Sequence, residues 1–272
     1  MTDLRASLAI PFGPHARQRI DVFSPSRSQP MATVLCVHGG WWSHGRHEDL
    51  RPFCLHLAEL GFACASLGYR LLGDGARSGL DIIADLAEGT KRALEAASID
   101  GSSGSSVVLL GSGAGSLAAL AAAAHINSEG IARVRGAIAC GVTPTLEAWE
   151  GCNATVARAL DQFGGANRLE HSPLHLPAKA LPPLLLLHGD SDLEVPARLA
   201  QRLHARQIEA GEESTVAVLT GVAHQFIEQP FERSGKAAME RIAPWLAEHG
   251  REPDRERLFT GMGTTASIIA EG

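Results

Sequence analysis

The sequence predicts an α/β protein in which helices cover both faces of a mostly parallel central sheet. Short apolar runs alternate with segments whose apolar residues recur at helical spacing, which is typical of strand–helix–strand units. The runs are apolar at nearly every position, as expected for strands that are buried on both faces. The 272 residues, of which 45% are hydrophobic, are sufficient to form one large core.

The net charge argues against nucleic acid or an anionic membrane as a partner. The formal net charge is −6, and no run of Lys or Arg offsets it. Residues 1–7 lack the apolar core of a signal peptide, and no apolar run is long enough to span a bilayer. We expect a cytoplasmic protein with a small-molecule substrate or ligand, no cofactor, and no nucleic-acid or membrane partner. A homodimer is an open alternative.

The five cysteines do not follow the spacing of a disulfide framework or a zinc site. Cys36, Cys64 and Cys140 lie in or near apolar segments. Cysteines in such places are typical of reduced core residues in a protein of the cytosol. We therefore expect free, buried thiols.

Two histidines near His38 raise the alternative of a metal site. His44 and His47 lie in the loop that follows it, but only Glu48 and Asp49 accompany them as further ligands. We expect these histidines to be ordinary surface residues, and no metal site is predicted.

The first hundred residues alternate between strand-like and helix-like segments. Gly13 separates two β-type runs, so an edge hairpin is expected there. Apolar residues recur at helical spacing from Leu50 to Leu60, and Gly61 follows as a suitable helix stop. The expected strands are residues 7–11, 19–23, 32–37 and 62–67, and the expected helices are residues 48–60 and 80–97.

The rest of the chain continues this alternation with one interruption. Residues 141–182 carry Trp149, short helical stretches and several X-Pro steps, so we expect them to lie over the strand ends as a lid or pocket wall. One domain is expected over residues 1–250, followed by a tail over 251–272 that is either loose or packed on a partner. The expected strands are residues 107–110, 134–140, 184–187 and 215–219, and the expected helices are residues 117–124, 197–210 and 231–249, the last kinked by Pro244.

The segment from Val107 to Ser116 combines an apolar run, a tight glycine-rich turn and the start of an alanine-rich helix. This is the context of a nucleophile elbow, whose usual pattern is G-x-S-x-G. Gly111 and Gly115 match the outer glycines, but Gly113 stands where the nucleophilic serine belongs. Glycine tolerates the positive φ of such a turn, so the turn is expected to form without the serine. A natural glycine and an inactivating replacement of serine are both open here.

Ser112 is the only hydroxyl next to this gap within the turn. Its side chain leaves the turn in a different direction, so a displaced nucleophile at Ser112 is a minor alternative. A phosphate-binding loop is excluded because the turn lacks both the G-K-[ST] ending and the dinucleotide-binding spacing.

Several loops with polar or glycine-rich motifs follow expected strands. They come after Val37, after Leu110 and after Leu187, and His224 follows the last strand. Because the carboxyl ends of parallel strands share one edge, where ligands bind, these loops are expected to meet there. Acyl transfer to serine needs a nucleophile, a histidine that takes its proton, and an acid that orients the histidine. Asp192 and His224 supply the last two.

Five short motifs follow one another along the chain. They are Q-R-I-D-V-F at 18–23, H-G-G-W-W at 38–42, G-Y-R-L at 68–71, H-G-D-S-D at 188–192 with Val195-Pro196, and G-V-A-H-Q-F at 221–226, and Ser172-Pro173 precedes the fourth. In this order they resemble the motifs of α/β-hydrolases of the HGG-containing esterase group, such as feruloyl-esterase-like and kynurenine-formamidase-like carboxylesterases. The resemblance covers nearly the whole chain up to about residue 250.

The resemblance implies an α/β-hydrolase fold and the hydrolysis of small or aromatic acyl esters through an acyl-enzyme. It assigns the triad acid to Asp192 and the base to His224, with Asp190 as a nearby, less suitable acid. The family's serine falls on Gly113, so hydrolysis by this sequence is expected to be very low. The residues implied for the oxyanion hole or for substrate binding are His38, Gly39, Gly40, Trp41, Trp42, Ser112 and Ala114, with the N–H donors near Gly40 or Trp41 and at Ala114.

Two further functions stay open. In the first, His224, oriented by Asp192, acts as a general base on water or on a substrate C–H group, which gives lyase, cyclase or direct-hydrolysis chemistry. In the second, the chain is a non-catalytic binder that holds a small ligand in a former hydrolase pocket.

Overall fold

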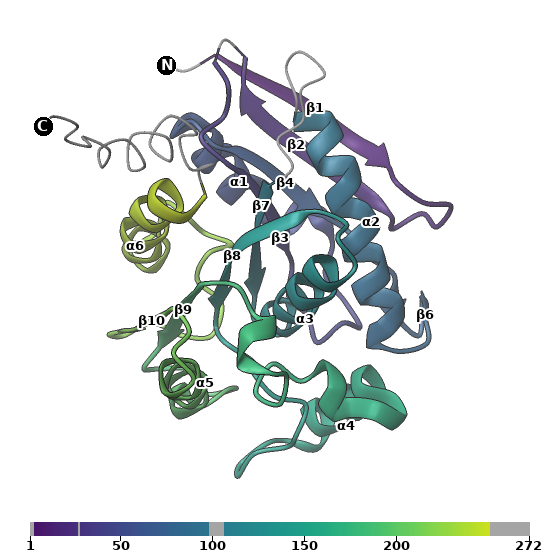
Figure 1. The fold of residues 1–272 in the computed structure, drawn as a ribbon, viewed down its shortest axis with the longest axis vertical. Coiled ribbons are helices and arrows are strands. Elements are labelled where there is room, and N and C mark those ends of the chain that lie inside the picture. Colours follow the sequence, from purple (N-terminus) through teal and green to yellow (C-terminus); the bar gives the residue numbers. More distant parts are fainter. Residues whose placement is uncertain (1–2, 27, 98–105, 251–272) are drawn as a thin grey trace, which may run out of the picture.

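An eight-stranded sheet runs through the molecule (Figure 1). The computed structural model describes residues 3–26, 28–97 and 106–250, so the expected tail at 251–272 lies outside the described residues. The strands of the sheet are β1 (Leu4–Pro11), β2 (Arg19–Pro25), β3 (Thr33–Val37), β4 (Ala63–Leu67), β7 (Ser106–Ser112), β8 (Arg133–Cys140), β9 (Leu184–Gly189) and β10 (Ser214–Leu219).

The strand order in space is β1-β2-β4-β3-β7-β8-β9-β10. From β4 to β10 all neighbours pair in parallel, whereas β2 is antiparallel to both β1 and β4. The predicted fold class, a mostly parallel sheet with an edge hairpin, is therefore confirmed. Two short strands, β5 (Leu71–Leu72) and β6 (Gly75–Ala76), form a separate small sheet that the sequence did not predict.

Helices cover both faces of the sheet, as predicted. One apolar core joins the sheet to α2, α3 and α5, and a second joins the opposite face to α1 and α6. The helices are α1 (Arg51–Glu59), α2 (Gly79–Ala97), α3 (Ala114–Ser128), α4 (Ala154–Gly164), α5 (Ala197–Glu209) and α6 (Arg233–His249), with short 3₁₀ helices η1 (His47–Leu50), η2 (Gly165–His171) and η3 (Ala178–Ala180).

Strand β3 shows why the buried strands are apolar throughout. Val34 and Cys36 point into the core under α1 and α6, whereas Leu35 and Val37 point into the core under α2 and α3. All four are fully buried. Both faces of such a strand lie under a helical layer, so most of its positions favour apolar side chains.

Two helix boundaries differ from the sequence prediction for identifiable reasons. Residues 47–50 form the 3₁₀ turn η1, and α1 begins only at Arg51, where the following Pro52 suits a first helical turn. Helix α3 begins directly at the glycine-rich turn rather than at residue 117. Pro244 lies inside α6, which is continuous through it.

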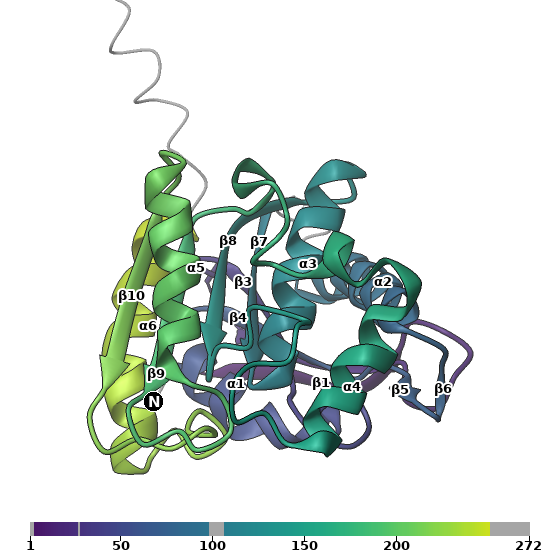
Figure 2. The same cartoon turned by 90° about the horizontal axis from the view of Figure 1, so that it is seen from below.

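Residues 141–182 form the expected interruption of the alternation. They contain α4, η2 and η3, and α4 contacts α2. In Figure 2 the arrows of β8 and β10 point to one edge of the sheet, and α4 lies on that side of the molecule. In the described ranges, no helix combines the length and the apolar character needed to cross a membrane.

Candidate active site

The turn between β7 and α3 has the strained geometry of a nucleophile elbow. Gly113 is the N-cap of α3, with φ 53° and ψ −126°. This conformation favours glycine, and in serine hydrolases the nucleophile occupies such a strained turn. The Gly113 N–H donates to the Cys140 carbonyl oxygen over 2.7 Å, which ties the turn to the end of β8. The predicted sharp bend between strand and helix at residue 113 is confirmed.

Glycine at position 115 lets the loop after β3 pack against the start of α3. A Cβ atom on Gly115 would lie 2.3 Å from the His38 carbonyl oxygen, closer than a side chain tolerates. This close approach brings the H-G-G-W-W segment, residues 38–42, beside the elbow. The outer glycine of the motif therefore has a packing role that a larger residue could not fill.

Two loops at the same edge bring Asp192 and His224 together. Asp192 lies in the loop after β9, and His224 lies in the segment after β10. Asp190 joins the two loops, because its Oδ1 accepts the Gly221 N–H over 2.7 Å. His224 Nδ1 donates to Asp192 Oδ2 over 2.7 Å. The predicted pair is thus hydrogen-bonded, and the competing Asp190 is an exposed residue that braces the loops.

Asp192 is held as a buried carboxylate by four donors. Its Oδ1 accepts the N–H groups of Glu194 at 2.8 Å and Val195 at 2.9 Å. Its Oδ2 lies 2.9 Å from His188 Nε2, in addition to the bond from His224. Burial would raise the pKa of Asp192, but the hydrogen bonds from the two histidines hold it well below its usual range. The side chain, 0% exposed, therefore has one orientation and a full negative charge.

His188 is a second partner of the acid that the sequence analysis did not predict. The Val142 N–H donates to His188 Nδ1 over 3.0 Å, so the ring hydrogen stands on Nε2. That Nε2–H points to Asp192 and to the Val195 carbonyl oxygen, 2.8 Å away. The available signal was the motif itself, since His188 opens the H-G-D-S-D stretch.

The free nitrogen of His224 faces the space above Gly113. A Cβ atom built on Gly113 would lie 2.8 Å from His224 Nε2. Burial lowers the pKa of His224, but the hydrogen bond and charge of Asp192, together with the charges of Glu194 and Glu228, raise it above its ordinary value. The arrangement is an oriented imidazole whose second nitrogen points at the Cβ position of residue 113.

The turn after β3 carries three consecutive residues with positive φ. The φ angles of Gly40, Trp41 and Trp42 are 96°, 46° and 57°. Such a conformation is uncommon for residues other than glycine and marks a constrained turn. On the other side of the elbow, Ala114 is the first residue of α3, so its N–H has no partner within the helix. These are the positions at which the sequence predicts the oxyanion donors.

The two adjacent tryptophans have different surroundings. The Trp41 ring is nearly parallel to the His224 ring, at 3° and 6.3 Å between centroids. Its Nε1 donates to Glu194 Oε2 over 3.2 Å, and Trp149 of the 141–182 segment lies 6.4 Å from it. Trp41 therefore covers one side of the imidazole, where it is accessible to a ligand.

Trp42 is fully buried, and the expectation that its side chain lines the pocket is wrong. Its ring packs on Phe163 of α4 with 4.2 Å between centroids. The positive φ angles of the turn send the two neighbouring side chains in different directions, and the sequence carries no signal for which one points inward.

His38 supports the turn rather than acting as a base. Burial lowers its pKa to about 4, so the ring is neutral at neutral pH. Its Nδ1 donates to the Gly39 carbonyl oxygen at 2.8 Å, and the Tyr69 ring stacks on it at 4.3 Å. The Tyr69 hydroxyl donates to the His38 carbonyl oxygen over 2.9 Å, which further fixes the backbone.

The Ser112 side chain is hydrogen-bonded to Glu228 and not to His224. Its hydroxyl, almost fully buried, donates to Glu228 Oε1, whereas the His224 bond goes to Asp192. A cavity of about 590 Å³ lies beside this contact, bordered by Gly39, Gly40, Glu228 and other mostly polar residues. Neither Gly113 nor His224 borders it, so this cavity adjoins the candidate site without containing the imidazole.

In the described part of the chain, one group of side chains has the spacing of metal ligands, and it contains none of the candidate active-site residues. It consists of Cys36, Cys54 and Cys64. The chemistry available at the sheet edge is therefore that of an imidazole, a carboxylate and backbone N–H groups.

The family model that matches this chain is BD-FAE, and it covers residues 20–171. The chain belongs to the BD-FAE family. The matched region includes β3, the turn after it and the elbow between β7 and α3. The esterase-like α/β-hydrolase assignment implied by the five motifs is thereby supported at the level of the family.

Two curated relatives come from Arabidopsis thaliana. Isoprenylcysteine alpha-carbonyl methylesterase ICME is 23% identical over 256 residues, which cover 84% of this chain and 58% of that protein. Probable isoprenylcysteine alpha-carbonyl methylesterase ICMEL2 is 26% identical over 262 residues, which cover 84% and 59%. This BD-FAE chain thus spans less than two thirds of the length of these relatives.

Solved esterase structures share the fold. Esterase B from Lactobacillus rhamnosis superimposes with a TM-score of 0.73 at 20% identity over 90% of this chain and 87% of that one. The esterase of Pyrobaculum calidifontis gives 0.75 at 19% identity over 90% and 85%. The sheet with helices on both faces is therefore the α/β-hydrolase fold.

Proposed function

We propose that this BD-FAE chain binds small carboxylic esters at the edge formed by the loops after β3, β7 and β9. We further propose that its hydrolysis through an acyl-enzyme is very slow, because Gly113 supplies no nucleophile. The observation that carries the proposal is the 2.8 Å between His224 Nε2 and the Cβ position of residue 113. A general base stands where a serine hydroxyl would need it, with its orienting acid in place.

The expected size of the loss follows from the chemistry. Removal of the nucleophile from a serine triad costs a factor of about 10⁶ in rate, or about 8 kcal/mol of transition-state stabilisation. Binding and the oxyanion donors still leave about 10³–10⁴-fold over water. The two Arabidopsis relatives are named as methylesterases, which supports an ester as the ligand class.

Gly113→Ser tests this proposal. The variant should hydrolyse short p-nitrophenyl esters at least about 10³-fold faster than the parent, a conservative fraction of the factor that a nucleophile supplies. The new Cβ would be 2.8 Å from His224 Nε2, so the imidazole must retreat by a few tenths of an ångström. Covalent labelling of the introduced serine by a fluorophosphonate, followed by mass spectrometry, provides a second readout that does not need full turnover.

Gly113→Ala is the matched control, because it adds the same Cβ without the hydroxyl. It should show no gain in hydrolysis and no labelling, and Gly113→Ser combined with His224→Ala should lose the gain. A folded Gly113→Ser variant with neither turnover nor labelling would contradict the proposal.

A second candidate function is direct general-base catalysis without a covalent intermediate. It is favoured by the same imidazole, which reaches into the volume that a side chain at position 113 would fill. Water or a substrate atom in that volume would contact Nε2, which could take its proton. In this case the parent has a measurable activity that His224→Ala abolishes, and Gly113→Ala lowers it by filling the volume. A non-catalytic binder would instead bind the ligand without turnover, so neither substitution would have an activity to lower.

A further inference from the structure

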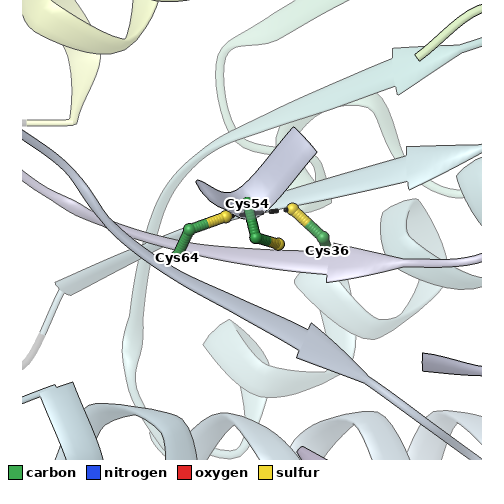
Figure 3. Close-up of side chains that lie close together, drawn as sticks. All are labelled: Cys36, Cys54 and Cys64. Atoms are coloured by element: carbon green, nitrogen blue, oxygen red, sulfur yellow. Dashed lines mark hydrogen bonds between the residues drawn. The ribbon is translucent and has the colours of Figure 1, made fainter. Parts of the chain in front are cut away.

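Three of the five cysteines converge in the apolar layer between the sheet and α1 (Figure 3). Cys36 lies in β3, Cys54 in α1 and Cys64 in β4, and all three are fully buried, free thiols. Their Sγ atoms all lie within 4.8 Å of one another, and those of Cys36 and Cys64 are 3.4 Å apart. One buried cysteine packs as a small apolar side chain, but three gathered sulfurs form a set of soft ligands.

The sulfur spacing suits a single central ion. A metal–thiolate bond is about 2.3 Å long, so three sulfurs in one plane around an ion lie about 4 Å apart. The Cys36–Cys64 separation of 3.4 Å is shorter than that value, and the other two sulfur–sulfur separations are at most 4.8 Å. Small side-chain rotations are therefore sufficient to close the set around an ion.

The group offers three ligands rather than four. Within the described ranges, no histidine, carboxylate or further cysteine joins it. Ser66, which faces Cys36 in the register of β3 and β4, donates its hydroxyl to the His47 carbonyl oxygen. Structural zinc takes four ligands, whereas soft sulfur ligands also select copper(I), which is stable with three.

We propose that Cys36, Cys54 and Cys64 bind one copper(I) ion. The ion ties α1 to β3 and β4 from inside the core, and β3 leads directly into the turn that begins at His38. Each thiol that becomes a ligand thiolate releases its proton to water, so binding strengthens as the pH rises. The proposal does not depend on the ester chemistry at the sheet edge.

Burial determines how the ion enters. All three sulfurs are covered in the folded chain, so loading requires α1 to separate from the sheet or the chain to fold around the ion. Copper(I) added during refolding should therefore be taken up rapidly, and copper(I) added to the folded chain slowly.

The test uses the full, reduced chain under anaerobic conditions. Copper(I) is added to the folded chain and, in a second arm, during refolding, and both samples are passed over a desalting column with bathocuproine disulfonate as competitor. The refolded chain should retain about one copper per chain, and X-ray absorption at the copper edge should show three sulfur ligands at about 2.3 Å, the usual metal–thiolate length. The loaded chain should also unfold at a higher temperature than the copper-free chain.

Loss of an outer-sphere partner costs up to about 100-fold in metal affinity. Cys54→Ala removes a direct ligand, so it should weaken copper retention by at least about 100-fold. Cys140→Ala is the matched control, because Cys140 is a buried thiol of the same core outside the group, and Cys152→Ala controls for the most exposed thiol among the described residues. Both controls should retain copper as the parent does. Three results would overturn the proposal: no copper in either arm, fewer than three sulfur ligands in the parent, or an equal loss of copper in Cys152→Ala. If Cys54→Ala does not fold, the X-ray absorption spectrum of the parent still decides.

Discussion

The two halves of the candidate site are built in different ways. The half that follows β9 and β10 consists of side chains, in which Asp192 has four donors and His224 has a fixed orientation. The half that follows β3 and β7 consists of backbone turns. Four of its residues have positive φ, namely Gly40, Trp41, Trp42 and Gly113. The first half holds a base that is hydrogen-bonded to its orienting acid, whereas the second presents a backbone turn with glycine at position 113.

The two halves are each held by contacts that involve no side chain at residue 113. The strained turn at Gly113 is stabilised by its own backbone hydrogen bond to Cys140 and by the close packing at Gly115. The acid is held by His188 and two N–H groups even without His224. Each half should therefore respond to substitutions in its own way.

The largest expected effect is the loss of catalytic rate in Asp192→Asn, which removes the acid that orients His224. Measured in the Gly113→Ser background, it should lower kcat for a p-nitrophenyl ester by about 10⁴-fold, as expected when an amide replaces the acid of a triad and favours the wrong tautomer of the base. Asp190→Asn is the neighbouring control and should change kcat little, because asparagine keeps the Oδ1 that accepts the Gly221 N–H and Asp190 does not bond to His224. Equal losses in both variants would argue that Asp192 acts only through loop structure.

Trp42→Ala should destabilise the half that follows β3 and β7, because it removes a buried ring that the turn after β3 carries. The ring is fully buried against Phe163, so its loss should lower the free energy of unfolding by about 3–5 kcal/mol, measured by urea denaturation.

The adjacent Trp41→Ala is the matched comparison, and it should cost less than about 1 kcal/mol because this ring is only partly buried. It should instead raise KM for aromatic esters in the Gly113→Ser background, because the ring borders His224. Similar stability losses for the two tryptophans would contradict the assignment of Trp42 alone to the core.

The smallest expected effect is a shift in the pH dependence of kcat/KM, which tests how Asp192 and His224 interact. The neutral imidazole is the base, so kcat/KM of Gly113→Ser should rise with pH through the pKa of His224. The charge of Asp192 raises that pKa above its ordinary value, so the midpoint should lie above about 6.5. In Asp192→Asn the midpoint should fall, because burial then dominates. A midpoint that does not move would exclude Asp192 as the cause.

Local sequence patterns were sufficient for most of the fold. Apolar runs and helical spacing located the strands of the parallel sheet and the helices around it, because burial on both faces leaves a pattern that is visible in the chain. The 3₁₀ turn before α1 and the strands β5 and β6 were not predicted. Such short elements depend on a few contacts and leave no periodic signal.

The sequence alone determined that Gly113, Asp192 and His224 belong to one edge, because motif order and strand direction depend only on local patterns and topology. Only the tertiary structure decided that Trp41 faces His224 while Trp42 enters the core, that His188 shares the carboxylate, and that Cys36, Cys54 and Cys64 meet. These results depend on side-chain directions and on contacts between distant segments, and neither follows from the identity of neighbouring residues in the chain.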